Sequence, residues 1–193
     1  PTEVNFNYTE ANGWQYTFFA PHDISGQISL ASSPEAFSQL VENQFSASSE
    51  TSGRHQVDIT GLLGQYAHGN EPSHHVAYLQ SFVGKQWRTS EIVTEILTDL
   101  YSSEPDGLCG NEDCGQMSAW YVMSALGFYP VTPASNIYII GSPVFDEVII
   151  HLENGKDLII EAENQSEEDM YIQTASFNAK VLATSYLNQE MFE

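Results

Sequence analysis

Residues 116–140 read QMSAWYVMSALGFYPVTPASNIYII and contain the change of pattern that decides the fold. Up to Gly127 the apolar residues recur with a helical period, and a glycine followed by Pro130 is typical of a helix end. After Pro133 the pattern becomes a short β-branched run, Ile137–Ile140. The sequence therefore predicts a helix over 116–126, with helical structure before residue 133 and β structure after it.

Working outward, the chain carries three more helical patterns upstream and three more β patterns downstream. A helix over 34–45 begins at Ser33-Pro34, one over 72–83 ends before Gly84, and one over 89–100 has Thr89 or Ser90 as its cap. Strands are predicted over 147–152, 157–162 and 170–175, with a turn at 153–156 between the first two. The predicted class is mixed α and β, with a helical region over 1–132 and an antiparallel β region over 133–193.

The excess of acidic over basic residues limits which classes of molecule the chain is expected to bind. In 193 residues, 26 Asp and Glu stand against 5 Lys and Arg, so the formal net charge is −21. Such a field repels phosphate backbones and anionic lipids but attracts divalent cations and tolerates neutral ligands such as sugars. No apolar run approaches the length of a membrane span, so we expect neither nucleic-acid binding nor membrane insertion. The start at Pro1, without an initiator Met, is expected of an excised piece.

The chain has two cysteines, Cys109 and Cys114, five positions apart. This is not the spacing of a zinc site, and two thiols are too few for a disulfide scaffold. A local disulfide and two reduced thiols both remain open.

The first polar loop surrounds Glu10, which lies among Tyr8, Trp14 and Tyr16. Aromatic rings that desolvate a carboxyl group raise its pKa and favour the protonated form that a general acid needs. The alternative is that Glu10 is an ordinary surface residue.

The second polar loop is Gly64-Gln-Tyr-Ala-His-Gly-Asn-Glu-Pro-Ser-His-His75. If Pro72 opens a helix, Glu71 occupies the N-cap, where it either complements the helix dipole or has another task. Glu71 with His74 and His75 suggests a transition-metal hydrolase. The side-chain oxygens of Asn70, Glu71, Gln65 and Gln15 instead suit a hard cation such as calcium, and this is the interpretation we favour.

The third polar loop is Glu104-Pro-Asp-Gly-Leu-Cys-Gly-Asn-Glu-Asp-Cys-Gly115, directly before the helix over 116–126. Its glycines allow close bending, but its register is not that of an EF-hand. Asp113 either caps the following helix or, with Glu10 as the acid, is the base that activates a water molecule.

At these three loops the sequence resembles glycoside hydrolase family 92, the calcium-dependent exo-α-mannosidases. The resemblance rests on residues 69–75 and 107–121, continues in order through 125–131, 141–146 and 171–173, and covers about residues 5–187. It departs at Glu10-Ala11-Asn12, where Glu-Gly-Asn is expected.

The resemblance implies the C-terminal part of a catalytic region: helices of a partial (α/α)6 toroid followed by β-sandwich strands that stop before the last one. It implies hydrolysis of terminal α-linked mannose with inversion. Glu10 looks like the general acid and Asp113 like the general base, with Glu112 or Asn111 in support.

The resemblance also implies one Ca²⁺ beside the sugar, held by Glu71 and Asn70. The implied substrate is an α-mannoside or N-glycan, and the implied location is secreted or periplasmic. We expect activity to need the missing N-terminal region of the parent chain; otherwise the chain is a catalytically incomplete, carbohydrate-binding piece. The candidate sugar contacts are Trp14, Arg54, His55, Gln56, His74 and His75, with Tyr66 and Trp87 as further stacking candidates, although a core role is favoured for Trp87.

Overall fold

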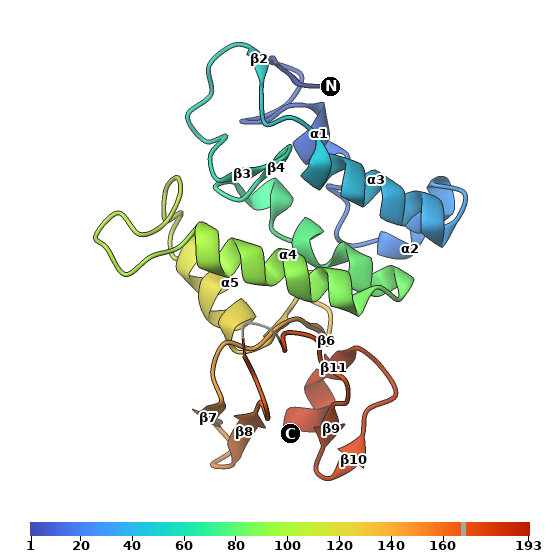
Figure 1. Cartoon of the computed structure of the whole chain (residues 1–193), viewed down its shortest axis with the longest axis vertical. Coiled ribbons are helices and arrows are strands. Elements are labelled where there is room, and N and C mark those ends of the chain that lie inside the picture. The colour runs from blue at the N-terminus through green and yellow to red at the C-terminus, as the bar shows by residue number, and fades with distance from the viewer. Residues whose placement is uncertain (167–168) are drawn as a thin grey trace.

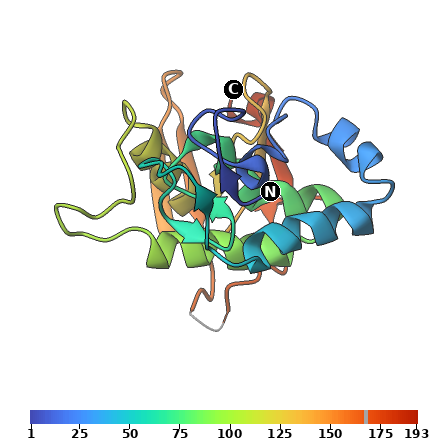
Figure 2. The same cartoon turned by 90° about the horizontal axis from the view of Figure 1, so that it is seen from above.

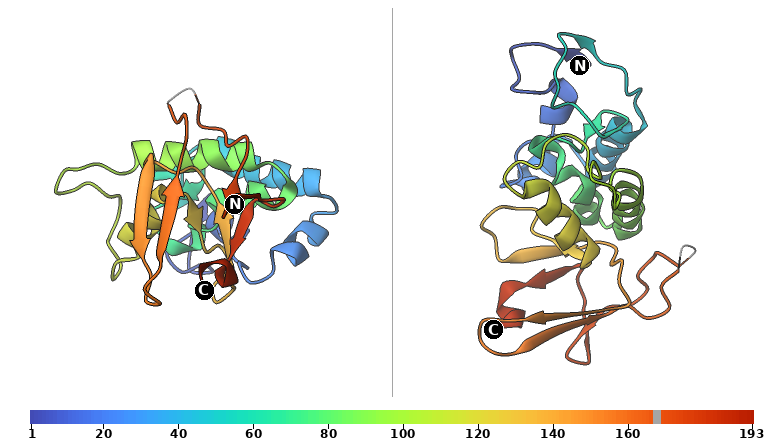
Figure 3. Two further views of the ribbon diagram at one scale, coloured as in Figure 1. Left: turned by 90° about the horizontal axis from the view of Figure 1, so that it is seen from below. Right: turned by 90° about the vertical axis from the view of Figure 1, so that its left-hand side faces the viewer.

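The structure is a computed structural model that describes residues 1–166 and 169–193. Helices form its middle and upper parts, and the later strands form its lower end (Figure 1). The side view in Figure 3 shows the same order from the N-terminus, through the helices, to the strands. The chain is therefore a mixed α and β protein, as predicted.

The predicted helices are present, with corrections at their starts. Helix α3 (Pro34–Ser46) begins after Ser33, which caps it, and α5 (Gln116–Ala125) ends before the left-handed Gly127. Helix α4 (Gln86–Asp99) begins three residues earlier than predicted, so Thr89 and Ser90 are buried within it and do not cap it. Two short helices, α1 (Gly13–Tyr16) and α2 (Ile24–Leu30), precede these. No helix in the described residues is long and apolar enough to cross a membrane.

The segment predicted as a helix over 72–83 forms two 3₁₀ helices, η1 (Glu71–Ser73) and η2 (Val76–Val83). Asn70, not Glu71, is the N-cap of η1, and the left-handed Gly84 ends η2 as predicted. Every residue from 76 to 81 is buried, so this part of η2 has no solvent face. Amphipathic periodicity predicts a helix with one exposed side, and this segment passes through the core instead.

The core lies where η2 packs against α3 and α4, with α5 on the next side. The apolar stripe of α4, formed by Ile92, Val93, Ile96 and Leu97, is buried as its spacing predicts. Trp120 of α5 is fully buried beside Tyr78 of η2. This core holds η2, and with it the residues just before it, in a fixed place.

The strands form several small sheets. Strand β1 (Glu3–Val4) pairs in parallel with β2 (Ser52–Gly53), and the other pairs are antiparallel: β3 (Leu62–Leu63) with β4 (Tyr66–Ala67), β7 (Glu147–His151) with β8 (Asp157–Glu161), and β9 (Ser176–Phe177) with β10 (Lys180–Val181). A three-stranded sheet has the order β11-β6-β5, formed by Tyr186–Asn188, Ile137–Ile140 and Phe128–Tyr129. The β7–β8 hairpin turns at Gly155 as predicted.

The predicted strand over 170–175 is wrong: these residues are described but form no strand. Its apolar residues Tyr171 and Ile172 are more than 40% exposed, so no sheet face covers them. The division into regions 1–132 and 133–193 stays a prediction. Strand β5 lies before that division and pairs with β6 after it.

Candidate active site

Residues 65–75 form the centre of the candidate site, because the loop that carries Glu10 and the first residue of α5, which follows the loop of Asp113, both hydrogen-bond to them. All of these residues except Glu71 are buried. The side-chain Nδ2 of Asn70 donates to the backbone oxygen of Glu10 at 3.0 Å. Figure 2, seen from above, shows the N-terminal segment lying over the helical part while the loop after α4 projects to one side.

Glu10 itself has a left-handed backbone, with φ 54°, and its side chain is exposed. The expected desolvation by Tyr8, Trp14 and Tyr16 is therefore wrong for the described chain. Tyr8 and Tyr16 contact each other, with ring centroids 5.4 Å apart, and the hydroxyl of Tyr16 donates to the backbone oxygen of Thr9. The rings shape the loop and leave the carboxyl group at the surface.

A buried amide network holds the start of this loop. Asn12 caps α1, its backbone N donates to Gln15 Oε1 at 2.8 Å, and its Nδ2 donates to Gln65 Oε1 at 3.0 Å. Gln15 Nε2 donates to the backbone oxygen of Gln65 at 2.7 Å. Both glutamine side-chain oxygens thus already accept from Asn12 inside a buried network, which disfavours Gln15 and Gln65 as cation ligands.

The third polar loop ends in three successive left-handed residues, Asp113, Cys114 and Gly115, directly before α5. Gly115 is the N-cap and provides no side chain, so Asp113 does not cap the helix. Glu112 accepts from the backbone N of Ser118 at 3.0 Å and from its hydroxyl at 2.8 Å. Glu112 therefore does the capping, while the carboxylate of Asp113 is exposed and hydrogen-bonds to no described residue.

His74 connects the start of α5, directly after this loop, to the central segment. Its Nε2 donates to the backbone oxygen of His68 at 2.8 Å, because a carbonyl oxygen can only accept. The unprotonated Nδ1 then accepts from Gln116 Nε2 at 3.1 Å. Burial lowers the pKa of His74, while the hydrogen bond to His68 and the charge of Asp113 oppose that shift. Asp113 therefore lies within electrostatic reach of the central segment.

His75 is also buried, and its Nε2 donates to the backbone oxygen of Phe18 at 2.7 Å. Burial lowers its pKa to about 4. Because the Nε2 atoms of His74 and His75 both carry protons toward carbonyl groups, these atoms are not free to bind a metal. Among the described residues no group of three or more His, Cys, Asp or Glu could hold a metal ion. This arrangement opposes the transition-metal hydrolase interpretation.

The sequence did not predict a series of hydrogen bonds beneath the site, in which each side chain donates to the next. Tyr101 donates its hydroxyl to the backbone oxygen of Met117 at 3.1 Å, so it accepts from His68 Nε2 at 2.6 Å. His68 Nδ1 in turn accepts from the Tyr66 hydroxyl at 2.7 Å. Burial lowers the pKa of His68 to about 2 and raises that of Tyr66, so both side chains stay neutral. No sequence spacing relates residues 68, 101 and 117.

The candidate sugar contacts fall into different environments. Trp14, in α1, is half-buried, while Trp87 is 51% exposed, so the core role favoured for Trp87 is wrong. Tyr66 is fully buried and cannot stack on a ligand. Arg54 Nη1 donates to Gln56 Oε1 at 2.7 Å, and the Arg54 guanidinium lies 4.8 Å from the ring centre of Phe6. His55, the residue between Arg54 and Gln56 in the sequence, is exposed.

The oxygen donors at Asn70 and Glu71 fit part of a calcium site. With its Nδ2 engaged by Glu10, Asn70 has an Oδ1 that accepts from no described residue, and the adjacent Glu71 carboxylate is exposed. Calcium takes about 6–8 oxygens, which include amide oxygens, backbone oxygens and water. Asn70 and Glu71 would thus supply only some of the oxygen ligands that a bound Ca²⁺ needs.

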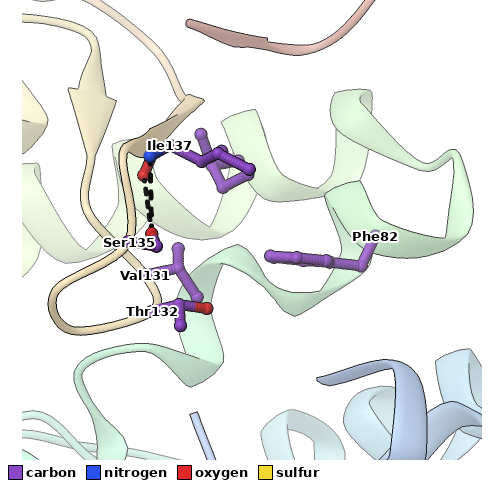
Figure 4. Close-up of a pocket in the computed structure, with 6 residues that line it drawn as sticks. Phe82, Val131, Thr132, Ser135 and Ile137 are labelled. Atoms are coloured by element: carbon purple, nitrogen blue, oxygen red, sulfur yellow. Dashed lines mark hydrogen bonds between the residues drawn. The ribbon is translucent and has the colours of Figure 1, made fainter. Parts of the chain in front are cut away.

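Two cavities among the described residues lie away from Glu10 and Asp113. One of about 160 Å³ is lined mainly by apolar side chains from η2 and residues 131–139 (Figure 4). Another of about 470 Å³ lies between the loop after α4 and α5, and its lining includes Tyr101, Glu104 and Tyr121. Neither contains Glu10 or Asp113, which lie at the open surface.

The two thiols are free, which decides between the two alternatives left by the sequence. Cys109 is half-buried, and burial raises the pKa of its thiol. Cys114 is exposed beside Asp113.

Comparison with known proteins places this arrangement in a family. The chain is similar to a family 92 α-mannosidase of Bacteroides thetaiotaomicron, with a TM-score of 0.88 and 38% identity over 99% of this chain and 25% of that one. A family 92 inverting mannosidase of the same organism gives a TM-score of 0.81 and 34% identity over 95% of this chain and 26% of that one.

A curated relative, an uncharacterized secreted glycosidase of Arthroderma benhamiae, is 27% identical over 186 residues, which are 95% of this chain and 22% of the relative. The chain thus spans about a quarter of the length of these relatives. Residues 1–193 match the model of the glycosyl hydrolase family 92 catalytic domain, and the chain therefore belongs to glycosyl hydrolase family 92.

Proposed function

We propose that the chain carries the acid and the base of an inverting α-mannosidase, with Glu10 as general acid and Asp113 as general base. The observation that carries the proposal is that the loop of Glu10 and the start of α5, which follows Asp113, are both attached to residues 65–75. Asn70 holds the backbone of Glu10, and His74 lies against Gln116 and within reach of the charge of Asp113. The family and the mannosidases among the similar structures supply the substrate class.

In this reaction protonated Glu10 gives its proton to the glycosidic oxygen as the bond to the anomeric carbon breaks. Asp113 takes a proton from a water molecule that attacks that carbon from the opposite face, which inverts its configuration. An inverting pair needs about 6.5–9.5 Å between its carboxyl groups so that the water fits. Asp113 suits the base role better than Glu112, because Glu112 is engaged at the start of α5.

We propose Ca²⁺ as the cofactor, with Asn70 Oδ1 and Glu71 among its ligands. When bound, it would supply a hard Lewis acid that attracts sugar hydroxyls. The chain's own contribution is geometric. The side-chain N–H of Asn70 donates to the backbone oxygen of Glu10, so the Oδ1 of Asn70 faces away from that bond and remains for the proposed cation. This hydrogen bond thereby fixes the loop of the acid relative to the proposed cation.

The remaining proposals concern the whole protein. We infer toroid helices and sandwich strands that the rest of a parent chain completes, an α-mannoside or N-glycan as substrate, and a secreted or periplasmic location. The secreted relative and the chain's share of about a quarter of its relatives' length support these inferences. In such an assembly other segments would cover the exposed Glu10 loop and desolvate its carboxyl group.

The test measures release of mannose from a chromogenic α-mannoside and from α-linked mannobioses, by the chain alone and by the chain joined to its N-terminal parent sequence. Glu10→Gln and Asp113→Asn are expected to lower kcat at least about a hundredfold, as for loss of a general acid or base. Glu104→Gln, an exposed acid of the same loop as Asp113, is the matched control. NMR of the first-formed sugar reports inversion. Activity that survives both substitutions would show that other residues carry the reaction.

Calcium is tested separately by chelation. Chelation is expected to abolish turnover, and Ca²⁺ but not Zn²⁺ is expected to restore it. Glu71→Gln should raise the Ca²⁺ concentration needed for half-maximal activity in a titration. The unfolding transition of the protein should stay unchanged. Restoration by Zn²⁺ alone would instead favour the transition-metal interpretation.

A second candidate function is carbohydrate binding without turnover. The exposure of both Glu10 and Asp113 in this chain favours it, because a general acid works best in a desolvated site. It predicts that the chain binds methyl α-mannoside, seen by saturation-transfer NMR, but releases no mannose until the parent sequence is joined to it.

A further inference from the structure

Asp58 lies where three segments of the site meet. One of its carboxylate oxygens, Oδ1, accepts from Asn111 Nδ2 at 3.4 Å, and the other accepts from Gln56 Nε2. Gln56 Oε1 accepts in turn from Arg54 Nη1 at 2.7 Å. A continuous set of side-chain hydrogen bonds therefore runs from the strand β2 segment to the loop of Asp113.

The far end of this set is attached to the N-terminal loop. The backbone N of Arg54 donates to the backbone oxygen of Val4 at 3.0 Å, and β1 pairs with β2 at that point. The Arg54 guanidinium also lies over the ring of Phe6. Phe6 and Glu10 belong to the same loop, so the hydrogen bonds connect the loop of the proposed acid with the loop of the proposed base.

We propose that Asp58 is a positioning residue: through Asn111 it fixes the loop that carries Asp113. The proposal rests on the proposed function for its effect on catalysis, but the positioning itself is a property of the chain. Neither Asp58 nor its partners touch the reacting atoms in this scheme. Asp58 acts only by holding the base loop in place.

The chemistry of residue 111 follows from this arrangement. Asp58 approaches a loop that already contains Glu112 and Asp113, in a chain of net charge −21. A carboxylate that meets this loop needs a neutral donor between the like charges, and Asn111 supplies one. An acid at position 111 would face Asp58 directly and repel it.

The arrangement also separates the three candidate sugar contacts at residues 54–56. Arg54 Nη1 donates to Gln56, and Gln56 Nε2 donates to Asp58, while the buried Nε of Arg54 has no partner among the described residues. His55 is exposed and its ring hydrogen-bonds to no described residue, so its whole side chain is open to a sugar. Arg54 and Gln56 then act as part of the support.

The experiment uses Cys114, an exposed thiol next to Asp113, as a reporter that does not depend on activity. A nitroxide spin label is attached to Cys114 in a Cys109→Ala background, and its mobility is measured by electron paramagnetic resonance. Asp58→Ala is expected to shift the spectrum toward the mobile component. Asp106→Ala, an exposed acid of the same loop with no side-chain hydrogen bond to a described residue, is the matched control and is expected to leave the spectrum unchanged.

Two further variants test the hydrogen bond itself. Asn111→Asp places like charges together and should mobilise the label as Asp58→Ala does. The exchange Asp58→Asn with Asn111→Asp restores a donor and an acceptor in reversed positions, and the amide introduced at position 58 keeps an oxygen for Gln56, so the label should regain its ordered spectrum. An ordered label in Asn111→Asp, or an exchange variant as mobile as Asp58→Ala, would overturn the proposal. Asn111 is exposed, so this arm remains informative if Asp58→Ala fails to fold.

In unlabelled protein Asp58→Ala is expected to lower kcat at least about tenfold with little change in KM, because a base displaced by about 1 Å loses much of its effect. If Asp113→Asn keeps full activity, the proposed function fails while the label still reports on positioning. If Asp113→Asn is inactive and Asp58→Ala has normal kcat and an ordered label, the positioning role alone is refuted.

Discussion

Acidification is expected to weaken the fold through His68 and His75, which are buried as neutral rings. Each donates one ring N–H, to the Tyr101 hydroxyl oxygen and the Phe18 backbone oxygen respectively. Their pKa values in the folded protein are about 2 and about 4, because burial disfavours the charged form. In the unfolded chain both should titrate near the ordinary value of about 6.5.

The sign of the effect follows from these values. Well above about pH 6.5 both states are neutral and stability is complete; as the pH falls through that value the unfolded chain binds protons that the folded chain does not. Stability is therefore lost as the pH falls, from about 6.5 to about 4 for His75 and further to about 2 for His68. At about pH 5.5 each of these two histidines costs about 1.4 kcal/mol, so together they should lower the free energy of unfolding by about 3 kcal/mol relative to about pH 7.5. His74, whose pKa burial also lowers, adds to the loss in the same direction.

Urea unfolding at the two pH values measures this difference. Trp120 is fully buried, with its ring centre 4.4 Å from that of His68, so its fluorescence reports the transition. His75→Gln keeps an N–H donor but cannot titrate, and it should reduce the pH-dependent loss by about half. His22→Gln, at an exposed histidine, is the control and should leave the loss unchanged. Equal unfolding free energies at both pH values, or a full loss in His75→Gln, would refute the reasoning.

Three substitutions test other parts of the structure by the same unfolding measurement. Glu112→Ala removes the acceptor for the Ser118 backbone N and should cost about 1 kcal/mol, and no loss would mean that the cap is unimportant. Tyr101→Phe leaves the buried Nε2–H of His68 unpaired and should cost about 2 kcal/mol, whereas an unchanged midpoint would argue against this series of hydrogen bonds. Gly64→Ala should cost about 3 kcal/mol, because residue 64 has φ 58° and an added Cβ would lie 2.3 Å from a backbone oxygen; a stable variant would contradict that backbone.

The sequence predicted those elements whose residues carry a local signal. The stripe of α4, the Ser33 cap of α3 and the glycine after α5 each report their structure within a few positions. Periodicity failed for residues 76–81, because a segment buried on every side has no contrast between faces. It also failed for residues 170–175, where a β-branched pattern forms no strand.

The candidate site was predictable in its parts but not in its connections. The motifs named Glu10, Asn70, Glu71 and Asp113, and those role assignments stay predictions. The hydrogen bonds that relate them join residues far apart in the chain, such as Asn70 with Glu10 and Asn111 with Asp58. Nothing in a single sequence pairs such positions, because side-chain contacts of this kind follow from the fold and not from spacing.

The backbone gives an argument for Asp113 that is independent of the motif. Glu10, Asp113 and Cys114 all have positive φ values, a conformation that costs non-glycine residues about 1 kcal/mol or more. Aspartate tolerates it better than glutamate or cysteine does. Several other described residues with positive φ lie in turns, where a glycine or asparagine would serve as well. At residue 10 a glycine would remove the strain but also the carboxyl group, and at residue 113 the left-handed turn leaves the side chain exposed while Glu112 takes the capping bonds. Because Glu112 alone takes the bonds at the start of α5, the carboxylate of Asp113 is left exposed and unengaged among the described residues, as the proposed base requires.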